Sequence, residues 1–182
     1  MQEIQGAGLM MVLVTGAAAG GKSGIAEEIA LGLGGRVLYA ATMLPDGEEG
    51  KERIARHLKL REGKGFNSVD HYVRIGELPC QGADTLLIEC LSNLLANEMF
   101  GGNGAKEGWR GSILGGISAL LGKGKNIVIV TSDVFADGGR YKAGTEAYAK
   151  ALGELNCSVA AASSVVVEAV AGLKVYLKGK PL

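Results

Sequence analysis

Short apolar runs alternate with longer segments in which apolar residues recur at helical spacing along this chain of 182 residues. Short runs rich in β-branched residues are typical of buried strands, and recurrence at every third or fourth position is typical of helices. We expect strands over residues 9–14, 36–41, 84–88, 126–130, 165–170 and 174–177, and helices over residues 22–33, 91–100, 109–121 and 145–163. Strands that alternate with helices predict an α/β fold, with a mainly parallel sheet and helices on both faces.

The segments between these expected strands and helices are consistent with a single domain. Residues 66–75 alternate enough to form a further strand or extended segment, in which we interpret His71 as a surface or packing residue. We expect residues 135–144 to form a glycine-rich loop and residues 1–8 to form a frayed N-terminal segment. Because we find no internal repeat and no linker, we expect one domain over residues 1–182.

The segment between the first strand and the first helix fits the phosphate-binding pattern G-x-x-x-x-G-K-[ST]. It consists of Gly16, Ala17, Ala18, Ala19, Gly20, Gly21, Lys22 and Ser23. A glycine-rich turn that happens to precede Lys-Ser is the alternative interpretation. The strand before and the helix after it favour a P-loop nucleotide-binding domain of the NTPase type.

The composition of this loop suits a nucleoside triphosphate. Successive backbone N–H groups can surround phosphate charges only where side chains are small, and residues 16–20 are all Gly or Ala. The N-terminus of the following helix adds to the field of these N–H groups. We expect Lys22 to contact the β- and γ-phosphates and the Ser23 hydroxyl to ligate Mg²⁺.

A charged stripe follows the second expected strand, on a helix that we expect from Asp46 as its cap to about residue 61. The stripe has a member at every fourth position: Glu49, Arg53, His57 and Arg61. One interpretation is a solvated face with a weak Glu49–Arg53 ion pair. In the other, Arg53 and Arg61 bind phosphates and favour the neutral form of His57 by like-charge proximity. A neutral imidazole can attack an α-phosphate and hold the nucleotide covalently.

Two carboxylates follow expected strands. Glu89 ends the strand over residues 84–88, and Asp133 comes shortly after residues 126–130. In phosphate-loop proteins a carboxylate at a strand end often faces Mg²⁺ or the nucleotide, although a strand-end residue that reaches solvent is the alternative for Glu89. Our candidate metal ligands are therefore Ser23, Glu89 and Asp133.

Composition narrows the class of protein. Lys and Arg (19) balance Asp and Glu (19), which argues against a general nucleic-acid-binding protein. Apolar residues make up 47% of the chain, yet no apolar run reaches the roughly 18 residues of a membrane span. Cys80, Cys90 and Cys157 lack C-x-x-C spacing, which suits reduced thiols. Since no secretory signal pattern is found, we expect a cytoplasmic protein.

With these residues in place, the chain resembles the adenosylcobinamide kinase / adenosylcobinamide-phosphate guanylyltransferase family of cobalamin biosynthesis. The resemblance covers nearly the whole chain after the first ten residues. Its most specific part is the run Arg-Ile-x-x-His at residues 53–57, at the right distance after Ala-Thr at residues 41–42. The other matching positions are residues 12–16, 39–42, Glu49, Arg61, 87–91, Asn97, 128–131, 153–156 and Gly172.

The resemblance implies a two-step transferase. The family phosphorylates the aminopropanol hydroxyl of adenosylcobinamide with a nucleoside triphosphate, GTP or ATP. It then takes GMP from GTP onto a histidine, matched here by His57, and passes it to adenosylcobinamide phosphate, which gives adenosylcobinamide-GDP and pyrophosphate. The implied partners are these nucleotides, a corrinoid and two further copies of the chain in a homotrimer. Lys22 and His57 are then the catalytic residues, and residues 16–23, Arg53, Arg61 and Glu89 bind the nucleotide.

The chain departs from the family pattern at several positions. Ala19-Gly20 stands where Arg-Ser is common, and residues 132–135 read Ser-Asp-Val-Phe instead of Asn-Glu-Val-Gly. Arg140, Glu146 and Lys150 replace a Pro, an Arg and an Asp. These differences concern corrinoid binding and the kinase step. Two alternatives therefore stay open: a P-loop small-molecule kinase without a covalent step, and a nucleotide- or corrinoid-binding relative with reduced or no turnover.

Overall fold

The computed structural model describes residues 8–45, 47–48, 50, 52, 54–55, 59, 63–133 and 143–182. Its elements, in chain order, are β1 Met11–Thr15, α1 Lys22–Gly32, β2 Val37–Ala41, β3 Asn67–Asp70, the 3₁₀ turn η1 Ile75–Glu77, β4 Thr85–Glu89, α3 Leu91–Phe100, the 3₁₀ turn η2 Lys106–Gly108, α4 Trp109–Gly122, β5 Asn126–Val130, α5 Ala143–Ala162, β6 Val165–Val170 and β7 Leu173–Lys178.

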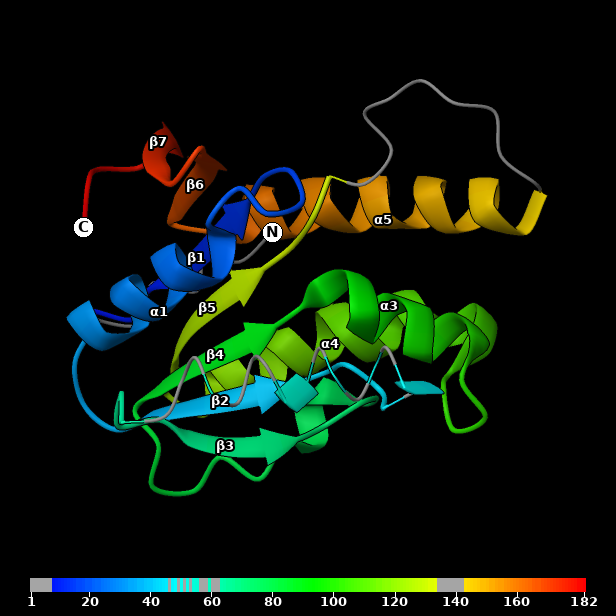
Figure 1. Cartoon of the computed structure of the whole chain (residues 1–182). Helices are drawn as coiled ribbons and strands as arrows, with labels where there is room; N and C mark the ends of the chain where they lie inside the picture. The colour runs from blue at the N-terminus through cyan, green and yellow to red at the C-terminus, as the bar shows by residue number, and fades with distance from the viewer. Residues whose placement is uncertain are drawn as a thin grey trace.

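The described strands form one seven-stranded sheet in the order β3-β2-β4-β5-β1-β6-β7. The pairs from β3 to β6 are parallel, and β7 runs antiparallel to β6 at the edge (Figure 1). The carboxyl ends of the parallel strands therefore meet at one edge of the sheet. In open α/β sheets, ligands bind outside this edge.

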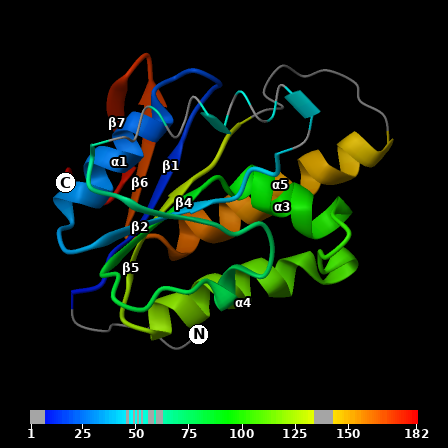
Figure 2. The same cartoon turned by 60° about the horizontal axis from the view of Figure 1, so that its bottom comes forward.

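Helices cover both faces of the sheet, as the sequence predicts (Figure 2). Alternate residues of β1 point to opposite faces: Met11 and Leu13 pack with the buried residues of α3, α4 and α5, whereas Val12 and Val14 pack with those of α1. Strands buried on both faces need continuous apolar runs, because neither side meets water. None of the helices in the described part of the chain combines the length and apolar character that crossing a bilayer requires.

The expected strands and helices are confirmed to within two residues at each bound, apart from two segments. The extended segment expected over residues 66–75 is wrong in part, because β3 ends at Asp70 and Ile75 begins η1. Arg74 takes a left-handed conformation with φ of 50°, which turns the chain away from the sheet before Ile75. The other exception is the helix expected up to residue 61: its described residues between 47 and 59 are helical, but its cap Asp46 lies outside the described residues. The expected N-terminal segment and the expected loop over residues 135–144 also lie mostly outside them.

Candidate functional site

The loop between β1 and α1 is shaped by the neighbouring strand as well as by its own sequence. Gly16 has a φ of 140° and Gly21 a φ of 94°, values that favour glycine. A Cβ added to Gly16 would lie 2.6 Å from the carbonyl oxygen of Ala169 in β6, and one added to Gly20 would lie 2.9 Å from the same atom. The N–H of Gly172 donates to the carbonyl oxygen of Gly20 at 3.0 Å. Close packing against β6 is therefore a second reason for the small residues of the loop.

Gly16→Ala is expected to lower the free energy of unfolding by about 2–4 kcal/mol, because the new methyl group meets backbone and the φ is unfavourable. Gly24→Ala, in α1, is the matched control. A Cβ at Gly24 meets no heavy atom within 4 Å, so this change should stabilise the helix by up to about 1 kcal/mol. Urea unfolding followed by circular dichroism measures both changes. Equal stability of the two variants would contradict the packing of the loop on β6.

Lys22 lies half-buried at the first position of α1. Its ammonium group donates a hydrogen bond to the carbonyl oxygen of Ala17, at 2.7 Å. Burial lowers the pKa of Lys22 from its ordinary value, while the neighbouring Cys90 and Glu89 act in the opposite direction. The ammonium group thus lies over the loop where the sequence predicts phosphate contact.

Ser23 and Glu89 meet at the carboxyl edge of the sheet. The Ser23 hydroxyl donates to Oε1 of Glu89 at 2.5 Å, and the Tyr39 hydroxyl donates to Oε2 at 2.5 Å. Glu89 is half-buried, so its carboxylate faces the start of α1 and not only solvent. Tyr39 is 2% exposed on β2. Its contact with Glu89 could not be predicted from the sequence, because it depends on the pairing of β2 with β4.

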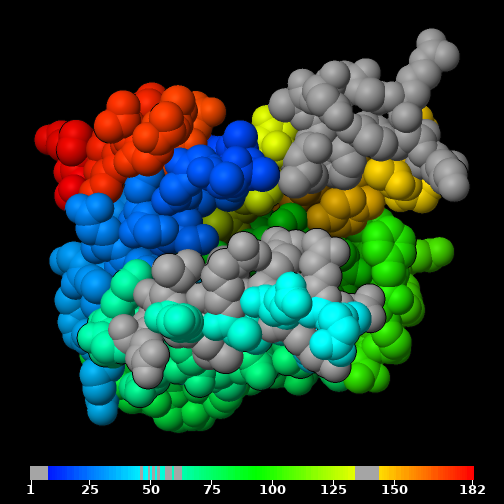
Figure 3. Space-filling model, in the orientation of Figure 1, coloured from blue at the N-terminus to red at the C-terminus, as the bar shows by residue number. Residues whose placement is uncertain are grey.

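Asp133, the third candidate metal ligand, follows β5 beside the loop. Its N–H points to the carbonyl oxygen of Gly16 at 3.5 Å, and its side chain is exposed. The dark blue loop and the yellow end of β5 share one face of the molecule in Figure 3. Within the described ranges, His, Cys, Asp and Glu side chains form no group of three or more that could hold a metal ion. Phosphate-loop proteins instead hold Mg²⁺ with a hydroxyl, a carboxylate and the phosphates themselves.

Arg53, His57 and Arg61 lie outside the described residues, as does Glu49. Their roles stay predictions from the sequence. Of the altered positions, Glu146 is exposed on α5, and so is Lys150 one turn later.

A network of polar side chains joins Glu89 to the ends of β2 and β3. The Thr42 hydroxyl accepts from the N–H of Cys90 at 2.6 Å and donates to its carbonyl oxygen at 2.8 Å. The amide nitrogen of Asn97, on α3, donates to the carbonyl oxygens of Thr42 at 2.8 Å and Tyr72 at 2.9 Å. Burial raises the pKa of the Cys90 thiol, which lies beside Glu89. The network fixes the strand ends that frame the site.

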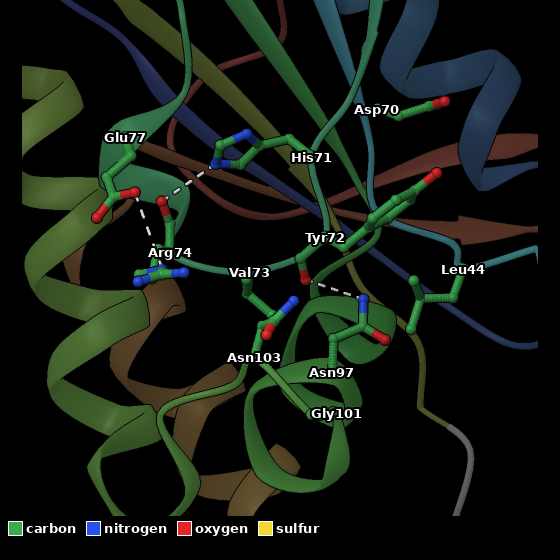
Figure 4. A pocket seen from close by; sticks show the side chains of 11 residues that line it. Leu44, Asp70, His71, Tyr72, Val73, Arg74, Glu77, Asn97, Gly101 and Asn103 are labelled. Atoms are coloured by element: carbon green, nitrogen blue, oxygen red, sulfur yellow. Dashed lines mark hydrogen bonds and ion pairs between the residues drawn. The ribbon is translucent and has the colours of Figure 1, made fainter.

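A cavity of about 300 Å³ opens beyond the ends of β2 and β3 (Figure 4). Figure 4 shows Arg74 and Glu77 on one side of it, Leu44 and Tyr72 on the other, and Asn103 between them. His71 lines the cavity half-buried, with its Nε2 3.1 Å from the carbonyl oxygen of Arg74. The cavity brings together segments that are far apart in the sequence, and no pattern within any one of these segments predicts it.

The profile of a family described as cobinamide kinase / cobinamide phosphate guanyltransferase matches residues 12–177. The bifunctional adenosylcobalamin biosynthesis protein CobU of Escherichia coli (strain K12) is 33% identical over 101 residues, which are 54% of this chain and 55% of that protein. The match thus spans about half the length of this relative. The crystal structure of the RadB recombinase aligns with 87% of this chain and 73% of its own, at 15% identity and a TM-score of 0.44.

Proposed function

This chain belongs to the cobinamide kinase / cobinamide phosphate guanyltransferase family, and from this premise we propose that it catalyses both reactions in that name. It phosphorylates the hydroxyl of adenosylcobinamide, and it then transfers GMP from GTP to the phosphate so formed. The observation that carries the proposal is the meeting of Ser23 with Glu89, at 2.5 Å, at the mouth of the phosphate loop. A loop hydroxyl and a strand-end carboxylate are the kinds of group with which P-loop enzymes hold Mg²⁺ at the nucleotide.

In the kinase step, the loop amides and Lys22 hold the triphosphate and offset the charge that develops on the transferred group. The substrate hydroxyl attacks the γ-phosphorus while its proton passes to water, and the bond from the γ-phosphorus to the β–γ bridging oxygen breaks to release the nucleoside diphosphate. Hydroxyl and carboxylate oxygens are the ligands that Mg²⁺ prefers, so Ser23 and Glu89 suit this ion. When bound there, Mg²⁺ would neutralise charge on the β- and γ-phosphates. Tyr39 keeps Glu89 in place by its hydrogen bond.

In the guanylyl step, a neutral His57 nitrogen attacks the α-phosphorus of GTP, and the bond to the bridging oxygen breaks to release pyrophosphate. A phosphate oxygen of adenosylcobinamide phosphate then attacks the same phosphorus. The nitrogen–phosphorus bond breaks, His57 is restored, and adenosylcobinamide-GDP is formed. Arg53 and Arg61 are proposed to hold the phosphates during both attacks.

Separate assays test the two reactions. Purified protein is incubated with Mg²⁺, ATP or GTP and adenosylcobinamide, or with GTP and adenosylcobinamide phosphate, and corrinoid products are separated by chromatography. We expect both products. Phosphorylation alone would favour a kinase without a covalent step, and neither product would favour a binding relative without turnover. The homotrimer and the cytoplasmic location implied by the resemblance are likewise proposals.

Glu89→Gln is expected to lower both rates about 100-fold at limiting Mg²⁺, because the neutral amide keeps its size but loses the charge that attracts the ion. The matched control is Glu28→Gln, on α1 itself, whose side chain is 68% exposed and whose carboxylate pairs with Lys174 at 2.8 Å. Initial rates over a range of Mg²⁺ concentrations measure the effect. An unchanged Mg²⁺ requirement in Glu89→Gln would remove Glu89 from the proposed site.

A further inference from the structure

The cavity beyond β2 and β3 has walls that are fixed by buried polar groups. Glu98, on α3, is fully buried, and its carboxylate accepts from the N–H of Arg74 at 2.6 Å, the Ser112 hydroxyl at 2.7 Å and the N–H of Ala105 at 2.8 Å. These bonds join the segment after β3, helix α4 and the loop after α3. A buried carboxylate satisfied by three donors holds its partners rigidly. These bonds therefore fix the segments that form two walls of the cavity.

The same cavity is connected to the phosphate-loop site. Its lining residue Asn97 holds the carbonyl oxygen of Thr42, and Thr42 bonds both backbone groups of Cys90, next to Glu89. From β3 to β4 the sheet spans two strand spacings, about 10 Å. In phosphate-loop enzymes the metal ion bridges the β- and γ-phosphates. Ser23 and Glu89, which would hold that ion, meet at the end of β4, so a transferable phosphate held there would face the side on which the cavity lies.

The chemistry of the lining excludes one ligand class and suits another. Arg74 pairs with Glu77 at 3.8 Å and Asp70 adds a second carboxylate, so these lining residues have no excess of positive charge to attract a triphosphate. The Asn103 amide offers both a donor and an acceptor. A lining that holds both donors and acceptors suits neutral amide groups, which use both. At about 300 Å³, the cavity lies at the small end of ligand pockets, roughly 300–1,000 Å³. It can take side groups of a corrinoid but not the whole macrocycle.

We propose that this cavity binds the amide side chains at the edge of the corrinoid acceptor and directs its hydroxyl arm toward Glu89. The proposal rests on the proposed function and adds the place where the acceptor binds. The nucleotide stays on the phosphate loop, and the macrocycle lies across the mouth of the cavity. Filling the cavity should therefore weaken corrinoid binding without weakening nucleotide binding.

Gly102→Phe tests this directly. Gly102 lines the cavity, and a Cβ there meets no heavy atom within 4 Å. Gly115→Phe, at an exposed position of α4 that is equally open, is the matched control. Equilibrium dialysis with adenosylcobinamide, followed by corrin absorbance, should show at least about tenfold weaker binding to Gly102→Phe only. Dialysis with GTP and Mg²⁺ should show equal binding to both variants. Asn103→Trp fills the cavity from the next residue and replaces Gly102→Phe if that variant does not fold.

The outcomes separate this inference from the proposed function. Unchanged corrinoid binding by both filled variants, beside an active wild type, would overturn the cavity assignment alone. Weaker GTP binding with unchanged corrinoid binding would assign the cavity to the nucleoside and also overturn it. A wild-type protein that binds GTP but no adenosylcobinamide would overturn the proposed function itself, and the cavity assignment with it.

Discussion

Lys22→Met is expected to lower the rates of phosphate transfer and of GMP transfer by about 100- to 1,000-fold, the usual cost of removing one donor that stabilises transition-state charge. Methionine keeps most of the length of the apolar stem, so packing at the start of α1 should persist. The lost ammonium group is the one that lies over the phosphate loop, 2.7 Å from the carbonyl oxygen of Ala17. Steady-state rates of both reactions at saturating nucleotide measure the effect.

Lys178→Met is the control for this change. The Lys178 ammonium group also donates to backbone carbonyl oxygens, those of Ala160 at 3.1 Å and Ala161 at 2.8 Å, but it lies on β7 at the edge of the sheet. Its loss should leave both rates within about twofold of the wild type. If Lys22→Met kept most of its activity, the segment 16–23 would be a glycine-rich turn and not a phosphate-binding loop.

His57→Ala is expected to separate the two reactions. GMP transfer should fall more than about 1,000-fold, because the nitrogen that carries the guanylyl group is gone. Phosphorylation of adenosylcobinamide should stay within about threefold, since the loop, Lys22 and Glu89 are unchanged. Lys178→Met is again the control, because Lys178 lies on β7 and bonds the carbonyl oxygens of Ala160 and Ala161, away from the loop and the cavity. Loss of both reactions in His57→Ala would point to a structural role of His57.

The layers of the fold could be predicted from the sequence because each strand is a separate apolar run. The strand over residues 126–130 is found as Asn126–Val130, and the one over residues 165–170 as Val165–Val170. Hydrophobic periodicity reflects burial directly, so a strand or helix can be recognised without knowing which elements it packs against. The short edge strand β3 was harder to predict, since its residues are mostly exposed and carry no apolar run.

The candidate site could be predicted only in part. The sequence predicts Ser23 and Glu89 as metal ligands because a P-loop motif and a strand end each carry a local signal, and the structure brings the two side chains together. Tyr39 and Glu98 carry none: their roles depend on the pairing of β2 with β4 and on the packing of α3 against its neighbours. The contact of Gly16 with Ala169 likewise depends on β6 lying beside β1. Contacts between distant segments depend on the tertiary structure, and no local pattern in the sequence predicts them.

The central claim is a covalent bond between His57 and GMP, and one measurement tests it most directly. Purified wild-type protein and His57→Ala are incubated with Mg²⁺ and GTP that carries ³²P at its α-phosphate, and each is then separated on a denaturing gel. We predict label on the wild type that acid removes and alkali does not, as for a nitrogen–phosphorus bond, and no label on His57→Ala. Label of equal intensity on both proteins, or no label on either, would contradict a covalent step at His57.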